Sequence, residues 1–212
     1  MKKLIYFSIL VFSIISISCN SDDDNIPYFK FSEEDEFFLL DNYNNSSKRL
    51  VFKNQENEEF SFIFKNFEEY KNRLILHGGG LGPVWGAIDV DHFYDMRKIE
   101  FIFEQNQEPR ADLRFTFNKY SDTLRGGIRF PLWNIDRYYI SSIRIDFNET
   151  KIGMTINGVT YNNVIKINSG ETSVDYMIGE FPRNVNVLYY DLLNGLIGFD
   201  DLDGGEWRLQ NN

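Results

Sequence analysis

Short segments in which apolar and polar residues strictly alternate set the strongest limit on the fold of this chain. In the clearest of them, Leu113, Phe115 and Phe117 alternate with polar residues. A period of two puts every second side chain on the same face of a β-strand, so each segment predicts a strand with one apolar face. The same alternation recurs at residues 60–64, 99–103, 143–147 and 152–156.

Strands of this kind are typical of antiparallel sheets with one face in water. Asn157-Gly158 and Asn194-Gly195 each stand between apolar residues and predict type I′ hairpin turns, and Asp203-Gly204-Gly205 predicts a further turn. Helical periodicity is scarce: residues 33–40 and 67–74 fit short helices or strands equally well. The predicted fold is all-β, either a single antiparallel β-sandwich or a strongly curved, partly open barrel.

The first residues have the character of a targeting signal. Two lysines follow Met1, and an apolar stretch too short to cross a bilayer permanently then ends at Ser18-Cys19. A small residue before the only cysteine resembles a bacterial lipobox, although Ser16 stands where leucine is usual. The resemblance implies a signal peptide over residues 1–18 and lipid attachment at Cys19. An ordinary secretory peptide with an incidental cysteine is the alternative.

An acidic run follows the cysteine, formed by Ser21, Asp22, Asp23 and Asp24. It resembles the export signal of surface lipoproteins in the Bacteroidota, which implies lipid anchoring in the outer membrane with the protein facing the cell exterior. A solvated acidic tether is the alternative. The expected organisation is a signal peptide (1–18), a lipidated cysteine with an acidic tether (19–30) and a single all-β domain (31–212).

The last third of the chain carries a second resemblance. Residues 158–164 resemble the G-x-x-Y-x-N-V hairpin of small secreted or lipid-anchored Bacteroidota proteins. Tyr189-Tyr190, then residues 195–199 and 205–209, resemble the paired tyrosines, G-[IL]-I-x-F strand and closing G-x-W of the same proteins. These proteins are largely uncharacterised, so the resemblance implies structure and location and transfers no catalytic residue.

Charge and cysteine content exclude several classes of protein. The chain has 32 acidic and 22 basic residues and a formal net charge of −10, which argues against a nucleic-acid partner. One cysteine excludes an internal disulfide framework. We expect an unidentified protein or glycan as the partner, besides the outer membrane itself.

Two histidine-containing patterns resemble catalytic or metal sites. His77-Gly78-Gly79-Gly80 matches the oxyanion loop of esterases, but no G-x-S-x-G nucleophile motif accompanies it, so a flexible turn is the better interpretation. His77 and His92 are also candidates to join Asp89, Asp91 and Asp95 around a metal. The spacing lacks the glycine and distal glutamate of a calcium loop. We expect no catalytic metal and no cofactor, and leave a structural calcium open at Asp89/Asp91 or Asp201/Asp203.

Paired carboxylates for glycoside hydrolysis are the remaining catalytic candidate. Glu100 and Glu104 lie on one predicted strand, where ordinary solvated residues would also point. Nothing in the sequence distinguishes them from such residues, so we predict no catalytic residue.

The chain is rich in aromatic residues, and two tryptophans stand beside prolines in predicted loops. Trp85 and Trp133 are candidate contacts for a sugar ring or a protein partner, with core lids as the alternative. In Tyr138-Tyr139 and Tyr189-Tyr190, one member of each pair should line a surface or a cavity. The sequence therefore favours a non-enzymatic binding or interaction module on the cell surface. A carrier of apolar ligands in a curved half-barrel and a glycan-active enzyme are the alternatives.

Overall fold

The computed structural model describes residues 26–44, 47–76, 89–105, 111–134, 142–172, 177–178 and 181–210. The chain divides into two compact units. The smaller comprises residues 1–28 and 73–93, and the larger comprises residues 29–72 and 94–212. In the smaller unit, the Phe93 amide donates to the Pro27 carbonyl at 2.8 Å. The larger unit carries most of the sheet.

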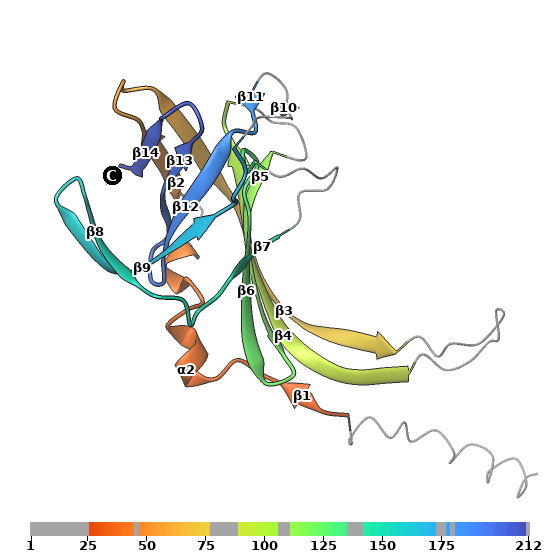
Figure 1. Ribbon diagram of the computed structural model, residues 1–212. Helices are drawn as coiled ribbons and strands as arrows, with labels where there is room; N and C mark the ends of the chain where they lie inside the picture. Colours follow the sequence, from red (N-terminus) through yellow and green to blue (C-terminus); the bar gives the residue numbers. More distant parts are fainter. Residues whose placement is uncertain are drawn as a thin grey trace, which may run out of the picture. The chain divides into compact units, whose positions relative to one another are not determined.

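Strands account for nearly all of the regular structure (Figure 1). In chain order the elements are β1 (Tyr28–Phe29), α2 (Glu33–Glu36), the 3-10 helix η2 (Asp41–Tyr43), β2 (Arg49–Lys53), β3 (Glu59–Leu76), β4 (Asp89–Phe103), β5 (Asp112–Tyr120), β6 (Thr123–Arg129), β7 (Ile143–Ile145), β8 (Ile152–Ile156), β9 (Val159–Asn168), β10 (Met177–Ile178), β11 (Phe181–Pro182), β12 (Val185–Asp191), β13 (Gly195–Asp201) and β14 (Glu206–Leu209).

The main sheet is one antiparallel sheet that curls into an open half-barrel (Figure 1). Its strand order is β7-β6-β5-β4-β3-β2-β14-β13-β12-β9-β8, with β10 and β11 forming a separate pair. The all-β prediction is confirmed, and of the two predicted architectures the curved, partly open barrel is the one observed.

The segment that follows β6 joins the two sides of the curled sheet. Trp133 forms a parallel bridge with Val185 at the start of β12. The Val185 amide donates to the Leu132 carbonyl at 3.0 Å, and the Asn134 amide donates to the Val185 carbonyl at 2.8 Å. The eight strands from β6 to β12 in sheet order are thereby linked into a ring at this point.

The predicted apolar rows of β4 and β5 lie inside this ring, whereas Ile152 of the predicted row at 152–156 is exposed. Ile99, Phe101 and Phe103 of β4 are fully buried, and so are Leu113, Phe115 and Phe117 of β5. Ring contacts join strands that are not hydrogen-bonded neighbours: Phe130, just after β6, lies 5.0 Å from Phe199 of β13, and Phe115 lies 6.2 Å from Tyr190 of β12. Side chains from different walls of the half-barrel therefore meet in its interior.

The two adjacent tyrosines of β12 belong to different clusters, as the alternation of a strand requires. Tyr190 lies in the main core. Tyr189 packs in a smaller second cluster with Ile156, Tyr161, Val164, Val187 and Ile197. The two side chains therefore point to opposite sides of the strand, but Tyr189 is buried in this second cluster, so the prediction that it lines an exposed surface is wrong.

The two Asn-Gly pairs behave differently. Asn157 and Gly158 have φ values of 49° and 80°, and Ile156 pairs with Val159, so the predicted type I′ turn is confirmed. At the second pair the prediction is wrong: Asp191 pairs with Gly195, and Gly195 has positive φ whereas Asn194 does not. A three-residue loop replaces the two-residue turn because the Asp191 carboxylate binds the amides of Leu193 and Asn194.

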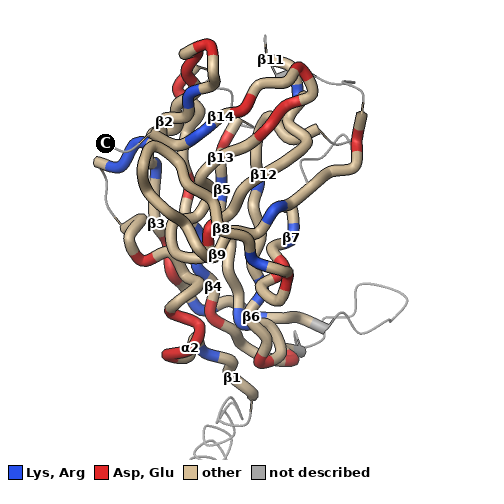
Figure 2. Tube along the Cα trace, turned by 60° about the vertical axis from the view of Figure 1, so that its left-hand side comes forward, with Lys and Arg blue, Asp and Glu red and all other residues tan. Residues whose placement is uncertain are grey.

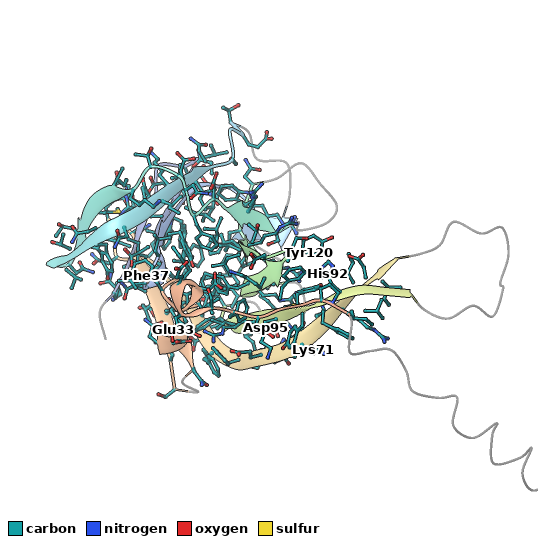
Figure 3. The ribbon with its side chains drawn as sticks, turned by 90° about the horizontal axis from the view of Figure 1, so that it is seen from below. Glu33, Phe37, Lys71, His92, Asp95 and Tyr120 are labelled. Carbon is teal, nitrogen blue, oxygen red and sulfur yellow. The ribbon has the colours of Figure 1, made fainter. Side chains whose placement is uncertain are left out.

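The segment before β2 fastens onto the sheet through a buried ion pair. Residues 67–74 lie within β3, and residues 33–36 form the short helix α2, whose acidic positions appear in red in Figure 2. Lys119 of β5 contacts the Asp35 carboxylate at 2.8 Å. Asp95 of β4 accepts the Phe31 amide at 2.9 Å, and Figure 3 shows Asp95 and α2 from below. Leu39, Leu40 and Tyr43 then enter the main core.

Candidate functional site

A surface hollow of about 360 Å³ lies where η2, β2, β9 and the end of β14 meet. We call it the Lys48 hollow; its principal lining residues are Tyr43, Lys48, Leu50, Tyr161, Leu209 and Gln210. Its volume falls in the range of small-molecule sites in proteins, which are apolar or aromatic with a few placed polar groups.

Tyr43 is the fixed wall of the hollow. Its hydroxyl donates to the Asn194 carbonyl in the β12–β13 loop, 151 residues away in sequence. Gly195 permits this approach, because a Cβ there would lie 2.8 Å from the Tyr43 hydroxyl oxygen. Burial raises the pKa of Tyr43, and the nearby groups of Tyr161 and Asp191 add to the effect. This wall is therefore neutral at ordinary pH.

Lys48 is a half-buried cation to which the described part of the chain supplies no counter-charge. Its Nζ lies 3.8 Å from the centroid of the Tyr43 ring, a cation–π contact. Burial lowers the pKa of the Lys48 ammonium. No carboxylate within the described ranges forms an ion pair with it. The adjacent residue shows the contrast, because Arg49 binds Glu104 through its Nε at 3.0 Å. Lys48 thus has N–H donors left for a ligand.

Tyr161 of β9 supplies a hydroxyl on the other side of the hollow. The residue is buried, and burial followed by the charge of Asp191 raises its pKa. Its hydroxyl forms no hydrogen bond with any residue that the structure describes. A neutral tyrosine hydroxyl can both donate and accept, so Tyr161 complements the donor-only Lys48.

A further tyrosine, Tyr190, lies close enough to Tyr43 and Asp191 for their charges to affect its pKa. Tyr190 is fully buried, its hydroxyl has no hydrogen-bond partner in the described structure, and burial, Tyr43 and Asp191 raise its pKa. Asp191 itself is occupied by the loop, since it also binds the side-chain amide of Asn194 at 2.7 Å. The three tyrosines Tyr43, Tyr161 and Tyr190 therefore lie near one loop-bound carboxylate, that of Asp191.

The carboxylates considered for glycoside hydrolysis are both held by cations. Glu100 is 3 % exposed, so the expectation of a solvated residue is wrong. It binds Arg114 at 2.5 Å and Lys98 at 3.1 Å. Burial would raise its pKa, but the hydrogen bond from Lys98 and the surrounding positive charges outweigh this and leave the pKa lowered. Hydrogen bonds from Ser61 and Arg49 lower the pKa of Glu104 as well. Neither has the raised pKa of a general acid.

Asp201 and Asp203 border a second hollow, of about 260 Å³, but their oxygens are used inside the turn. The Asp201 carboxylate accepts the amides of Asp203 and Gly205 at 3.0 and 2.7 Å and the Trp207 indole at 2.8 Å. The Asp203 carboxylate accepts the side-chain amide of Asn184. The pattern is that of a turn stabilised by its own aspartates.

The described residues of the predicted histidine-based metal site, His92, Asp91 and Asp95, do not come together as a set of metal ligands. His92 is buried and its Nδ1 lies 2.6 Å from the adjacent Asp91. Asp95 is engaged with the Phe31 amide, as noted above. His77 and the Asp89 side chain lie outside the described residues. Over the described ranges, no three His, Cys, Asp or Glu side chains gather closely enough to hold a metal ion.

Of the two candidate tryptophans, the structure places one. Trp133 is 5 % exposed and belongs to the main core, which is the core-lid interpretation. Trp85 lies outside the described residues, as do Tyr138-Tyr139, Cys19 and the acidic run Ser21, Asp22, Asp23 and Asp24.

The residues that form the Lys48 hollow were not singled out from the sequence as binding residues. Tyr161 belongs to the G-x-x-Y-x-N-V segment, which was interpreted as a structural motif. Lys48 stands beside Arg49 in an unremarkable polar stretch. Whether a carboxylate pairs with Lys48 depends on residues that the fold brings near it from elsewhere in the chain. The sequence around Lys48 therefore could not predict that it lacks such a partner among the described residues.

Comparison with known proteins gave no relative. No family model, curated protein or solved structure matches this chain. Among the described residues, no helix has the length and apolarity needed to span a membrane.

Proposed function

We propose that this chain is a non-enzymatic binding module, anchored by lipid at Cys19 to the outer face of the outer membrane, that holds a small organic anion in the Lys48 hollow. The observation that carries the proposal is the half-buried Lys48 ammonium, which faces a hollow of small-molecule size without a counter-charge. A buried charge is most stable when it is paired, so a bound anion would provide the counter-charge for the Lys48 ammonium.

The lining indicates the class of anion. Lys48 and the Tyr161 hydroxyl can donate to a carboxylate, which binds charged donors strongly. Leu209 offers partly exposed apolar surface beside them, and the buried Tyr43 ring and Leu50 lie behind it. A carboxylate attached to an aromatic or aliphatic ring satisfies both halves of the site. Its binding would raise the pKa of Lys48 back towards the ordinary value.

Two observations weigh against the alternative functions. The meeting of side chains from different walls of the half-barrel favours a packed interior over the cavity that a carrier of apolar ligands requires. The lowered pKa values of Glu100 and Glu104 disfavour them as an acid–base pair for glycan hydrolysis.

The membrane location is tested at the amino terminus. Cys19→Ala should abolish palmitate labelling and release the protein from membranes, because the thiol is the proposed attachment point. Replacing Asp22, Asp23 and Asp24 together by Asn should preserve membrane attachment and reduce exposure to external protease. Membrane attachment of Cys19→Ala equal to that of the natural chain would contradict the anchor.

The binding site is tested with benzoate as the probe. Titration of the full-length chain in detergent, followed by amide chemical shifts, should show saturable changes at Lys48 and Gln210. Benzamide has the same shape without the charge and should bind at least tenfold more weakly, in keeping with the strength of charge-assisted hydrogen bonds.

Three variants separate the hollow from general charge effects. Lys48→Met should abolish saturable benzoate binding, and Tyr161→Phe should weaken it several-fold. Lys166→Met is the matched control, since Lys166 also lies over a tyrosine ring, at 5.8 Å from that of Tyr189, but does not line the hollow. Equal binding of benzoate and benzamide, or unchanged benzoate binding in Lys48→Met, would overturn the proposed site.

A further inference from the structure

A third hollow, of about 410 Å³, lies on the β6–β7 edge of the sheet. It is lined by Thr123, Arg125 and Gly126 of β6, by Arg144 of β7 and by Ser142 just before β7. None of these residues lines the Lys48 hollow, and the inference below is independent of the function proposed above.

The two arginines of this hollow lack carboxylate partners. Elsewhere Arg49, Arg97, Arg114 and Arg208 each form an ion pair. Neither Arg125 nor Arg144 forms one with any residue in the described ranges. This is unusual in a chain whose net charge is −10, where carboxylates outnumber cations. The acidic residue directly after β7, Asp146, accepts the Asn148 amide.

The strand register brings both arginines to one face. Arg144 pairs with Gly127, and Arg125 stands two residues before Gly127 on the same side of β6. A guanidinium therefore flanks Gly127 from each strand. The Arg125 guanidinium is further held by stacking 4.5 Å from the centroid of the Tyr120 ring, a residue labelled in Figure 3. Stacking orders the guanidinium and leaves its in-plane N–H donors unused.

Glycines keep the floor of the hollow free of side chains. A Cβ on Gly127 would lie 2.1 Å from the Ser142 hydroxyl oxygen, and a Cβ on Gly126 would lie 2.6 Å from the Phe147 ring. The lack of a side chain at Gly127 leaves room for the Ser142 hydroxyl over the strand. The hollow thus combines two guanidiniums with the hydroxyls of Ser142 and Thr123.

We propose that this hollow binds a tetrahedral oxyanion, the sulfate or phosphate group of a larger molecule. Guanidinium groups match the oxygen spacing of such anions and bind them through paired hydrogen bonds. Two guanidiniums and two hydroxyls offer donors in several directions, which suits four oxygens arranged as a tetrahedron better than the two oxygens of a planar carboxylate. The acidic remainder of the chain repels extended polyanions, so the site selects a compact charged group.

The test is a titration of the full-length chain with inorganic sulfate, inorganic phosphate and acetate at constant ionic strength, followed by the arginine Nε–Hε signals. Sulfate and phosphate should shift the Arg125 and Arg144 signals in a saturable way, and acetate should bind more weakly. A sulfated disaccharide and glycerol 3-phosphate then identify the source of the group, because the natural type should bind more tightly than the bare ion.

Charge-matched variants decide whether the hollow is responsible. Arg125→Gln with Arg144→Gln should weaken sulfate and phosphate binding by at least tenfold, since two charge-assisted contacts are lost. Two exposed substitutions leave the fold intact, which circular dichroism can verify. Arg49→Gln removes a paired arginine and should leave binding unchanged. The proposal is overturned if neither ion shifts these signals, if acetate binds as tightly as they do, or if Arg49→Gln weakens binding equally.

Discussion

Asp35 connects α2 to the sheet through contacts that no other acidic residue of the helix makes. Its carboxylate accepts from the Ser32 amide at 2.7 Å and from Lys119 at 2.8 Å, and both members of the ion pair are largely buried. Asp35→Ala should lower the free energy of unfolding by about 3 kcal/mol, because it leaves the Lys119 ammonium buried without a partner. Urea unfolding measures the loss.

Glu34→Ala is the matched control, since Glu34 lies on the same helix turn, is exposed and carries the same charge. It should change the free energy of unfolding by less than about 0.5 kcal/mol. Similar effects of the two variants would show that Asp35 acts only through the charge of the helix.

At the scale of residues, the sequence predicted burial where local pattern determines it and failed where distant partners do. The rows of Ile99, Phe101 and Phe103 followed directly from the alternation. Glu100 stands in the same strand at a position that alternation makes outward-facing, yet cations from β4 and β5 bury it. The isolation of Lys48 likewise depends on which carboxylates the fold brings near it.

The β8–β9 hairpin depends on the turn at Asn157-Gly158. Gly158 has φ of +80°, a conformation that costs a residue with a Cβ about 1 kcal/mol, so Gly158→Ala should lower the free energy of unfolding by that amount. Gly153 of β8 is the control, because its φ is not positive and an added Cβ there meets no atom within 4 Å. Thermal unfolding of the two alanine variants compares them, and equal losses would contradict a role for the turn conformation.

At the scale of elements, a dipeptide signal predicts a turn only where contacts with the rest of the fold do not select a different loop. Asn157-Gly158 lies in a hairpin at the end of the sheet and adopts the predicted conformation. Asn194-Gly195 lies against Tyr43 and beside Asp191, and those contacts select a longer loop. The same reason explains residues 67–74, whose helical spacing is overridden by strand pairing within β3.

The closure of the half-barrel makes Trp133 a structural residue of the whole molecule. It is buried in the main core, and its backbone bridges the segment after β6 to β12. Trp133→Ala should lower the free energy of unfolding by about 3–5 kcal/mol, the range for truncation of a buried aromatic side chain. Phe37→Ala, at a residue 44 % exposed, should cost less than about 1 kcal/mol. A loss no larger than that of Phe37→Ala would remove Trp133 from the core.

Alkaline pH should destabilise the whole molecule through its buried tyrosines. Burial raises the pKa of Tyr43 and Tyr190, and burial with the Asp200 hydrogen bond raises the pKa of Tyr189 to about 12. The folded state thus holds these protons more tightly than the unfolded chain, where the pKa is about 10. Their contribution to stability is complete below about pH 10 and is lost as the pH rises through about 12.

Urea unfolding at about pH 9 and about pH 11 measures this loss, and tyrosinate absorbance follows ionisation directly. The buried tyrosines should ionise together with unfolding. Stability that is unchanged over this interval would contradict their burial.

At the scale of the whole molecule, the all-β class followed from the sequence, but the choice between sandwich and half-barrel did not. Alternation specifies which face of each strand is apolar and says nothing of how the strands curve or which ones close. Closure here depends on the bridge between Trp133 and Val185, residues far apart in sequence whose pairing has no local pattern.

The central claim is that a packed half-barrel presents its binding site on the outside, at Lys48. Native mass spectrometry of the full-length chain purified from its membrane tests this most directly, with the Lys48→Met variant measured beside it. We predict no adduct of lipid mass beyond the covalent anchor, and a small-anion adduct that is present in the natural chain and absent from Lys48→Met. A non-covalent lipid retained equally by both chains would contradict the account and indicate a carrier with an open interior.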